Sequence, residues 1–295
     1  DIDGIRHLYP ALSGDDPAVF DRSSGRWFVL SLARNTPLAY NNPWGYAGVL
    51  PVSGDFSGDG YTDLGVYDPV NGKWYIYDLR KGAAIVVGFP WGFSGAVPVP
   101  ADYNKDGYAD LGVFDSNSGR WYVYNLRTGK AMTPASGLAW GFKGTVPAPA
   151  DYDHDGQADL AVYYPPTGTW FIYNWFTGKA LSFNLNWGFA GTTPVVGDYT
   201  GDGYPDLGVY HPASGNWYIY NRRTGTVVAT GLAWGFSGVT PLAGDYNGDG
   251  RDEIVVFDSN TGTWYAYDLT KKYGFLASVP WGYRGVVPVP GNFGP

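Results

Sequence analysis

The sequence predicts an all-β protein, a six-bladed β-propeller whose blades are four-stranded antiparallel sheets. One set of six tryptophans recurs along the 295 residues at intervals of 47, 47, 49, 47 and 47: Trp27, Trp74, Trp121, Trp170, Trp217 and Trp264. A second set opens a W-G-[FY]-x-G segment in every repeat: Trp44, Trp91, Trp140, Trp187, Trp234 and Trp281. The two chain ends each contain part of one repeat. A period of this size indicates a fold built from repeated sheets.

One repeat in the middle of the sequence shows the elements of a blade. Residues 97–101 and 111–114 predict the first two strands, on either side of an acidic loop. A turn rich in Asp, Asn, Ser and Gly over 115–119 leads to a third strand at 121–126, and residues 128–129 turn the chain into a fourth. Both faces of the third strand are apolar, which is typical of a sheet packed between two neighbouring sheets.

The chain ends predict how the ring closes. Residues 286–293 provide a first strand without a blade of their own, whereas 18–21 and 27–30 belong to an N-terminal unit without a first strand. The two ends therefore complete one blade, which removes sheet edges that would otherwise invite association. We expect residues 15–295 to form a single propeller and the molecule to be a monomer. The longer repeat places its two extra residues in a surface hairpin at 133–137.

Composition and charge exclude several other classes of protein. The chain has 44 Gly, 22 Pro and no Cys, and it is 18% aromatic and 16% charged. It is therefore neither a disordered segment nor a disulfide scaffold. No apolar run is long enough to span a membrane. The net charge of -8 argues against a nucleic-acid partner, because that affinity depends on clustered Lys and Arg. The N-terminus has no signal-peptide pattern, which leaves room for a leader that has already been removed. We expect the protein to be secreted.

Five acidic loops provide the strongest chemical signal. They follow the pattern D-x-[DNST]-x-D-G-x-x-[DE], at residues 55–63, 102–110, 151–159, 198–206 and 245–253. Alternating oxygen ligands on a tight loop suit calcium, which takes about six to eight oxygens, and Gly at position six permits the sharp bend. The loops are not EF-hands, because Val stands at position twelve and a β-prone run follows.

We predict five structural Ca²⁺ ions, held by side chains at positions one, three, five and nine and by the carbonyl of position seven. The residues concerned are Asp55, Ser57, Asp59, Tyr61, Asp63, Asp102, Asn104, Asp106, Tyr108, Asp110, Asp151, Asp153, Asp155, Gln157, Asp159, Asp198, Thr200, Asp202, Tyr204, Asp206, Asp245, Asn247, Asp249, Arg251 and Glu253. The third loop has four carboxylates, so we expect it to bind most tightly. Five ions would bring the formal charge from -8 to +2. The alternative is that the loops are Asp/Gly turns that need no metal.

The unit PVPADYNKDGYADLGVFDSNSGRWYVYNLRTGK resembles the FG-GAP/VCBS-type repeat of calcium-binding β-propellers. That architecture is related to the head of integrin α chains and to certain fungal and bacterial propeller lectins. The resemblance covers almost the full chain and implies calcium between the first and second strands of a blade. The first blade departs from it, because Asn292 and Gly294 at one end and Asp16 at the other occupy the equivalent positions. We therefore count five sites and not six.

Residues 1–10, DIDGIRHLYP, are similar to the closing segment of matrixin-type zinc metalloprotease catalytic domains. The zinc motif H-E-x-x-H of that family is absent here. The resemblance implies that residues 1–14 are a linker or the remnant of an upstream domain, and that the propeller is the accessory, targeting domain of a secreted metalloprotease. The alternative is that the segment is a strand or lid of the first blade.

The inventory of catalytic groups is thin. There is no Cys, and His7, His154 and His211 lie in different repeats without a shared Ser or Glu partner. Tyr164 and His211 mark positions where the repeats differ. We expect this chain not to be an enzyme. The alternative is a polysaccharide lyase or glycosidase on a propeller, which would need a unique cluster of Tyr, His and Arg.

A binding module fits the residues better. The rim opposite the acidic loops combines aromatic rings with Asp, Asn, Arg and Gly, a mixture that suits stacking and hydrogen bonding of a sugar, and several weak sites can act together. We predict a lectin-like module that binds a glycan or extracellular matrix polymer through Trp44, Trp91, Trp140, Trp187, Trp234 and Trp281. The alternatives are that these tryptophans wedge between blades and never meet a ligand, or that the partner is a protein.

Overall fold

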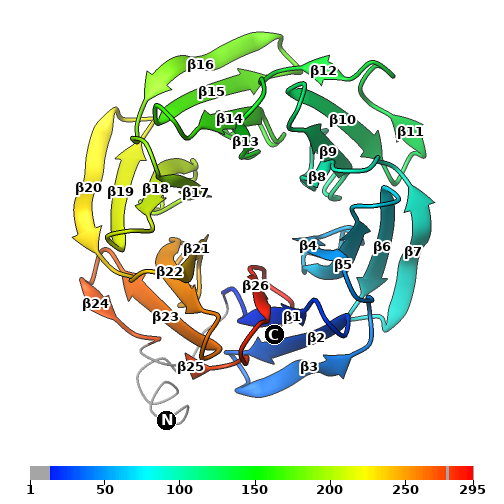
Figure 1. The fold of residues 1–295 in the computed structure, drawn as a ribbon, viewed down its shortest axis with the longest axis horizontal. Helices are drawn as coiled ribbons and strands as arrows, with labels where there is room; N and C mark the ends of the chain where they lie inside the picture. Colours follow the sequence, from blue (N-terminus) through cyan, green and yellow to red (C-terminus); the bar gives the residue numbers. More distant parts are fainter. Residues whose placement is uncertain (1–13, 277–278, 295) are drawn as a thin grey trace.

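A computed structural model describes residues 14–294 except 277–278, and Figure 1 shows six sheets arranged in a ring. The strands are antiparallel, and the first strand of each blade lies nearest the axis while the fourth lies at the outer edge. The described residues contain no helix, and therefore none that could cross a membrane. The prediction of an all-β, six-bladed propeller is confirmed.

Each blade pairs its strands in order from the axis outward. The first blade contains β26 (Val287–Val289), β1 (Ala18–Asp21), β2 (Arg26–Ser31) and β3 (Thr36–Asn42), and the second contains β4 (Leu50–Gly54), β5 (Asp63–Asp68), β6 (Lys73–Asp78) and β7 (Ala83–Pro90). The third contains β8 (Val97–Pro98), β9 (Leu111–Asp115), β10 (Arg120–Asn125) and β11 (Lys130–Ala131) with β12 (Leu138–Ala139), and the fourth contains β13 (Val146–Pro147), β14 (Leu160–Tyr164), β15 (Thr169–Asn174) and β16 (Lys179–Asn186). The fifth contains β17 (Thr193–Gly197), β18 (Asp206–His211), β19 (Asn216–Asn221) and β20 (Thr226–Ala233), and the sixth contains β21 (Val239–Gly244), β22 (Glu253–Asp258), β23 (Thr263–Asp268) and β24 (Tyr273–Gly274) with β25 (Val279–Pro280).

The first blade joins the two ends of the chain. Strand β26 pairs antiparallel with β1, with Ala18 opposite Val289 and Phe20 opposite Val287. The amide of Asp16 also donates to the carbonyl of Gly291 at 2.9 Å. The predicted closure of the ring is therefore confirmed. The metalloprotease-like residues 1–10 lie outside the described residues.

The fourth strand of the third blade is interrupted where the sequence has its two extra residues. Strand β10 pairs with β11 at one end and with β12 at the other, and the chain leaves the sheet between them. The amide of Gly137 closes a turn there by donating to the carbonyl of Pro134 at 2.8 Å. The extra residues lie in this outer segment and leave the three inner strands in register, as expected for a surface hairpin. The sixth blade, which has no extra residues, also has two short outer strands, β24 and β25.

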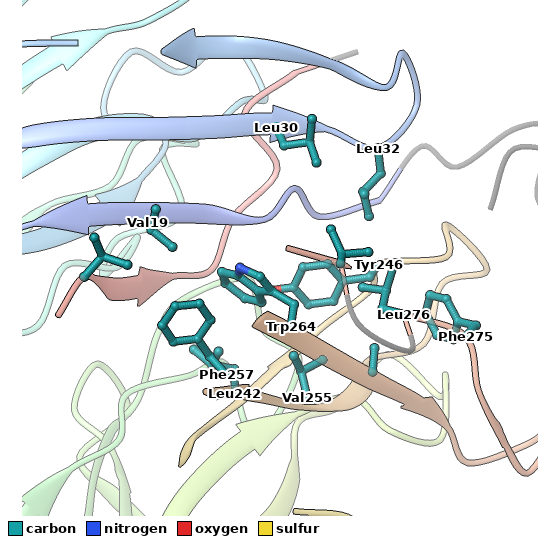
Figure 2. Packing of buried hydrophobic residues seen from close by; sticks show 13 residues of the cluster. Val19, Leu30, Leu32, Leu242, Tyr246, Val255, Phe257, Trp264, Phe275 and Leu276 are labelled. Atoms are coloured by element: carbon teal, nitrogen blue, oxygen red, sulfur yellow. The ribbon is translucent and has the colours of Figure 1, made fainter. Parts of the chain in front are cut away.

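The apolar core consists of six clusters, and each cluster lies between two neighbouring blades. Figure 2 shows the cluster between the sixth and first blades, where Trp264 and Phe257 face Val19 and Leu30. The six tryptophans at the start of the third strands are completely buried in these clusters. The Nε1 atom of each donates to the carbonyl of the W-G-[FY]-x-G tryptophan of its own blade at 2.6 to 2.9 Å. The two tryptophan sets therefore fix the connection to the next blade.

The third strand packs on both of its faces. In β10, Trp121 and Val123 belong to the cluster with the fourth blade, whereas Tyr122 and Tyr124 pack against the cluster with the second blade. This arrangement explains why alternate positions are all large and apolar, and it confirms the expectation of a sheet between two sheets.

Candidate metal sites and the aromatic rim

The five acidic loops connect the first strand of a blade to its second strand, on one rim of the ring. In the loop at 55–63, Asp55 accepts hydrogen bonds from the backbone amides of Gly58 at 2.6 Å and Gly60 at 2.7 Å. Asp63 accepts from the amides of Phe56 at 2.9 Å and Ser57 at 2.8 Å. Gly60 has a φ of 85°, which favours glycine at this bend. The backbone therefore holds the first and last carboxylates of the loop in place.

Two of the loops bring three carboxylates together closely enough to hold a metal ion. The first group is Asp151, Asp153 and Asp159, and the second is Asp245, Asp249 and Glu253. Within each group the candidate ligand atoms lie within 4.8 Å of one another. The third loop, for which the sequence predicts the tightest binding, is one of these two sites.

Unpartnered oxygen atoms indicate that the loops suit a hard cation. Buried side-chain oxygens of Asn104, Asp153, Asp206 and Asn247 have no hydrogen-bond partner among the described residues. All four occupy position three or nine of a loop, where the sequence predicts calcium ligands. A buried oxygen without a donor carries a desolvation penalty, and a bound Ca²⁺ would offset it. The residues present therefore fit calcium.

The carboxylates at position nine have perturbed acidities. Burial, together with neighbouring carboxylates, raises the pKa of Asp63, Asp110, Asp159 and Asp206 to about 7. The same causes raise the pKa of Glu253 to about 9. Without a cation, the folded protein therefore favours the protonated forms of the four aspartates below about pH 7 and that of Glu253 also at neutral pH.

These pKa values predict a pH dependence of stability that calcium reverses. In EDTA, the melting temperature should fall between about pH 4 and pH 7, because the folded state holds protons on these carboxylates that the unfolded chain has released. Calcium requires the deprotonated forms, so the increase in melting temperature caused by calcium should grow over the same interval. Thermal unfolding in EDTA and in calcium at four pH values measures both trends. A melting temperature in EDTA that rises steadily from pH 4.5 to 7 would contradict the prediction.

At position seven, the side chains lie beside neighbouring elements. The rings of Tyr61, Tyr108 and Tyr204 stack with arginines that follow the third strand of the same blade, at 4.3 to 4.8 Å from guanidinium carbon to ring centroid. Arg251 instead donates through Nε to the carbonyl of Thr200 in the neighbouring loop at 3.1 Å. Only the backbone carbonyl of position seven is therefore required for the predicted ligand set.

Backbone hydrogen bonds connect the acidic loops of neighbouring blades. The amide at position eight donates to the carbonyl at position one of the preceding blade, as from Ala109 to Asp55 at 2.7 Å and from Ala158 to Asp102 at 2.7 Å. Pro205 has no amide to donate, so the junction between the fourth and fifth blades lacks this bond. A metal ion that orders one loop would therefore also strengthen its contact with the next blade.

A buried residue that the sequence motifs do not include lies beside every loop, and in four blades it is hydrogen-bonded to the loop. It ends the third strand and is Asp78, Asn125, Asn174, Asn221 or Asp268, all of them buried. Asn174, for example, donates to Asp153 and to Asp155 at 2.9 Å each, and its Oδ1 accepts from the amide of Thr177. These residues recur with the same period as the tryptophans, which is the signal that could have revealed them.

The blades with Asp at this position contain a compensating lysine. Lys81 lies 2.8 Å from Asp78, and Lys271 lies 3.0 Å from Asp268 and 3.1 Å from Asp249. Burial tends to raise the pKa of Asp78, but the hydrogen bonds from Lys81 lower it. In the third, fourth and fifth blades the pair is Asn and Thr, so the net charge of the pair is the same. The pair beside a loop is therefore neutral overall in both kinds of blade, either as two opposite charges or as two uncharged side chains.

The first blade has the loop geometry without the acidic residues. Asp16 takes the role of position nine, since its carboxylate accepts from the amide of Phe293 at 3.2 Å, and from Leu32 at 3.1 Å. Asn292 takes position one, and its carbonyl accepts from the amide of Thr62 at 2.6 Å. A single buried carboxylate does not make a calcium site, which agrees with the count of five loops.

The loop at 151–159 offers a selective test of the predicted ligands. Asp153→Asn removes one of its four carboxylates, and we expect the affinity of one calcium site to fall by about tenfold, because ligand charge tunes calcium affinity. Isothermal titration calorimetry measures the change. Asn104→Asp makes the opposite change at the same position of the preceding loop and should tighten that site. Equal affinities for both variants and the parent protein would show that position three is not a ligand.

The tryptophans of the W-G-[FY]-x-G segments lie on the opposite rim, half-buried between blades. The ring of Trp44 lies 5.0 Å from Tyr77, and that of Trp140 lies 4.6 Å from Tyr173, in each case on the next blade. Trp91, Trp187 and Trp234 make the equivalent contact at 5.0 to 5.1 Å. Trp281 donates through Nε1 to the carbonyl of Phe28 on the first blade at 3.3 Å. The predicted ligand residues thus contact the neighbouring blade in all six repeats.

Two of these tryptophans also line surface cavities. Trp140 lines one of about 250 Å³ with Phe142, Phe171 and Phe183. Trp281 lines another of about 240 Å³ with Phe28, Tyr40 and Tyr283. The isolated histidines lie elsewhere: His154 packs against Tyr204 on the acidic rim, and His211 packs against Phe189.

Comparison with known families agrees with this geometry. The profile of the FG-GAP-like repeat matches residues 102–162 and 198–256, which contain four of the five acidic loops. The chain therefore contains FG-GAP-like repeats, and this part of the sequence-based resemblance is confirmed. No curated protein sequence matches the chain.

Solved structures share the propeller fold at low sequence identity. An Agrocybe aegerita lectin, described as specifically recognising non-reducing terminal N-acetylglucosamine, is 17% identical with a TM-score of 0.56, over 93% of this chain and 75% of the lectin. A Bacteroides caccae protein of unknown function is 13% identical with a TM-score of 0.55, and a nidogen/laminin complex is 12% identical with a TM-score of 0.54; each match covers 93% of this chain and 98% of the other. At these identities the similarity concerns the fold alone.

Proposed function

We propose that this chain is a calcium-stabilised β-propeller that binds glycans outside the cell. The observation that carries the proposal is the division of the ring into two rims. One rim has five acidic loops, four of which contain a buried, unpartnered oxygen, and the other has aromatic rings that line surface cavities. Aromatic walls with a few polar groups suit the apolar face and the hydroxyls of a sugar. The lectin of the same fold recognises a terminal sugar, which supports this assignment.

The calcium part of the proposal implies an extracellular location. Sites built from three carboxylates on independent loops bind calcium weakly to moderately, so they would fill at the millimolar concentrations found outside cells. In this setting the ions are structural, because each lies within the connection between two strands. The proposal includes an accessory role beside a secreted metalloprotease, which rests only on the resemblance of residues 1–10.

A glycan array in millimolar calcium, with matrix proteins captured in parallel, tests the binding function. Binding to a saccharide series supports the proposal, and binding to matrix protein alone would overturn the glycan assignment. Release of product from any polysaccharide would favour a lyase or glycosidase instead. Trp91→Ala and Trp234→Ala address the tryptophans: loss of binding at an unchanged melting temperature makes them ligand platforms, whereas intact binding with a lowered melting temperature makes them wedges.

A further inference from the structure

Two of the six blade junctions have an exposed aromatic surface that the described residues of the other junctions do not form. At the junction of the sixth and first blades, Phe28 lies 5.5 Å from Tyr40 and 5.7 Å from Tyr283, with the rings nearly perpendicular in both pairs. At the junction of the third and fourth blades, Phe171 lies 5.5 Å from Phe183 and 5.6 Å from Phe142, again nearly perpendicular. We call these the aromatic cages.

The two cages have the same arrangement of rings. In each cage one ring, Tyr40 or Phe183, comes from the fourth strand of the blade, and we call it the outer ring. Its centroid lies near the tryptophan of the W-G-[FY]-x-G segment at that junction, at 6.4 Å between Tyr40 and Trp281 and at 6.3 Å between Phe183 and Trp140. The outer rings are 72% exposed for Tyr40 and 73% exposed for Phe183. Exposed aromatic rings at matching positions do not contribute to the core, so the fold does not explain them.

Four sequence differences occur together at these junctions. The residue directly after the buried tryptophan of the third strand is Phe28 or Phe171 at the cages, whereas the other blades have Tyr75, Tyr122, Tyr218 and Tyr265 there. At the position of the outer ring, Tyr40 or Phe183, the second, third and fifth blades have Val87, Ser136 and Thr230. The next residue is Asn41 or Asn184, with φ of 59° and 62°, where those three blades have glycine in the same conformation.

The fourth difference is a charge. The variable residue of W-G-[FY]-x-G is Arg284 or Lys143 at the cages, and it is Ala47, Ser94, Ala190 or Ser237 elsewhere. Both basic side chains are exposed, and neither belongs to an ion pair of the described residues. Each follows directly on a ring of its cage, Tyr283 or Phe142. Neither side chain lines the cavity itself, but each is one residue away from a cage ring, so a ligand that extends beyond the cage would meet one positive charge.

We propose that the two cages are equivalent binding sites for an anionic sugar, that is, a pyranose that carries a carboxylate or a sulfate. The apolar face of the sugar stacks on the exposed ring of Tyr40 or Phe183, and its acidic group pairs with Arg284 or Lys143. This assignment rests on the proposed function of the chain as a glycan-binding module. It narrows the six tryptophan sites to two sites of defined chemistry.

The charges near the cages favour this ligand over a cationic one. An aromatic cage without basic residues would suit a quaternary ammonium group, but Arg284 and Lys143 would repel it. Asp21, which lies beside the first cage, keeps its negative charge, but its oxygens already accept from Tyr283 at 2.8 Å and from Ser23 and Ser24 at 2.6 Å. Its carboxylate therefore holds the cage ring in place.

The position of the cages on the ring predicts binding of a long polymer. The first and fourth blades are separated by two blades in either direction, and β3 and β16 lie on opposite sides of the ring in Figure 1. Both cages lie on the rim opposite the acidic loops. One polysaccharide that reaches both sites would gain affinity from the second contact without any new interaction.

Calorimetric titration in millimolar calcium tests the assignment with three hexasaccharides: a glucuronate-containing one from hyaluronan, a sulfated one from heparin, and neutral chitohexaose. We expect two sites per chain for at least one of the acidic sugars, and the pair shows whether carboxylate or sulfate is preferred. Tyr40→Ala or Phe183→Ala should each weaken one site by about tenfold or more and leave the other unchanged, and the double variant should weaken both. Both rings are exposed, so the melting temperature should not change. Val87→Ala, at the same position of the second blade and 70% exposed, is the matched control.

Lys143→Gln with Arg284→Gln tests the charge. We expect weaker binding of the acidic sugar and a smaller dependence on salt. If acidic polymers bind the double aromatic variant as tightly as the parent protein, the cages are not the sites, although the glycan-binding function stands. If no saccharide binds the parent protein, the proposed function itself fails. Tighter binding of chitohexaose, or of a trimethyl-lysine peptide, overturns the anionic assignment.

Discussion

Removal of calcium with EDTA should lower the melting temperature of this propeller by at least about 10 °C. A site filled at about 100 times its dissociation constant adds about 2.7 kcal/mol to the free energy of unfolding. For a domain of this size, 1 kcal/mol corresponds to about 2–4 °C. Several sites act on one ring, and the loops are joined across blades by hydrogen bonds such as that from Ala109 to Asp55. Differential scanning calorimetry in EDTA and in millimolar CaCl₂ measures the effect.

Sodium chloride at matched ionic strength is the control for simple screening of the acidic surface. Screening alone relieves repulsion among all carboxylates and should raise the melting temperature only slightly. Magnesium is a second control, because it demands a smaller octahedral site and gives up its waters reluctantly. The same transition in EDTA and in calcium would mean that the loops are Asp/Gly turns and that their unpartnered oxygens meet only water.

The sequence predicts the fold well because the periodicity specifies it. The spacing of the tryptophans defines the blades, and the alternation in residues such as Trp121 and Tyr122 defines a sheet with two buried faces. The partial repeats at the ends predict that β26 pairs with β1, since an unpaired first strand and a blade without one complete each other. Each of these inferences requires only local spacing and the pairing rules of strands.

Side-chain contacts between blades could not be predicted in the same way. Asn174 touches Asp153 only because the end of the third strand and the acidic loop meet on one rim, which depends on blade geometry. The sequence leaves open whether the tryptophans of the W-G-[FY]-x-G segments are ligand platforms or wedges, because it does not show which blade surface faces each ring. The cage residues Tyr40 and Phe183 look unremarkable in the sequence until their strands are placed beside Trp281 and Trp140.

Substitution of a third-strand tryptophan by alanine, as in Trp121→Ala, should destabilise the propeller by about 3–5 kcal/mol. Trp121 is completely buried among Val123, Leu160 and Val162, on the face that meets the fourth blade. Its removal leaves a cavity between two blades and also deprives the carbonyl of Trp140 of a donor at 2.6 Å. The expected loss of stability therefore has two parts: the lost packing between the blades and the lost hydrogen bond that holds the connection to the next blade.

Trp121→Phe separates these two contributions, because it retains most of the apolar ring and removes only the Nε1 donor. We expect it to cost about 1–3 kcal/mol, the penalty for leaving a partly buried carbonyl unpaired together with a smaller void. Phe176→Ala is the matched control, since that ring is 74% exposed and its removal should change the stability by less than about 0.5 kcal/mol. Urea unfolding in calcium, with m-values compared among the variants, measures all three. If Trp121→Ala were as mild as Phe176→Ala, the blades would not be held together through their tryptophan clusters, and the packing described for the junctions would be wrong.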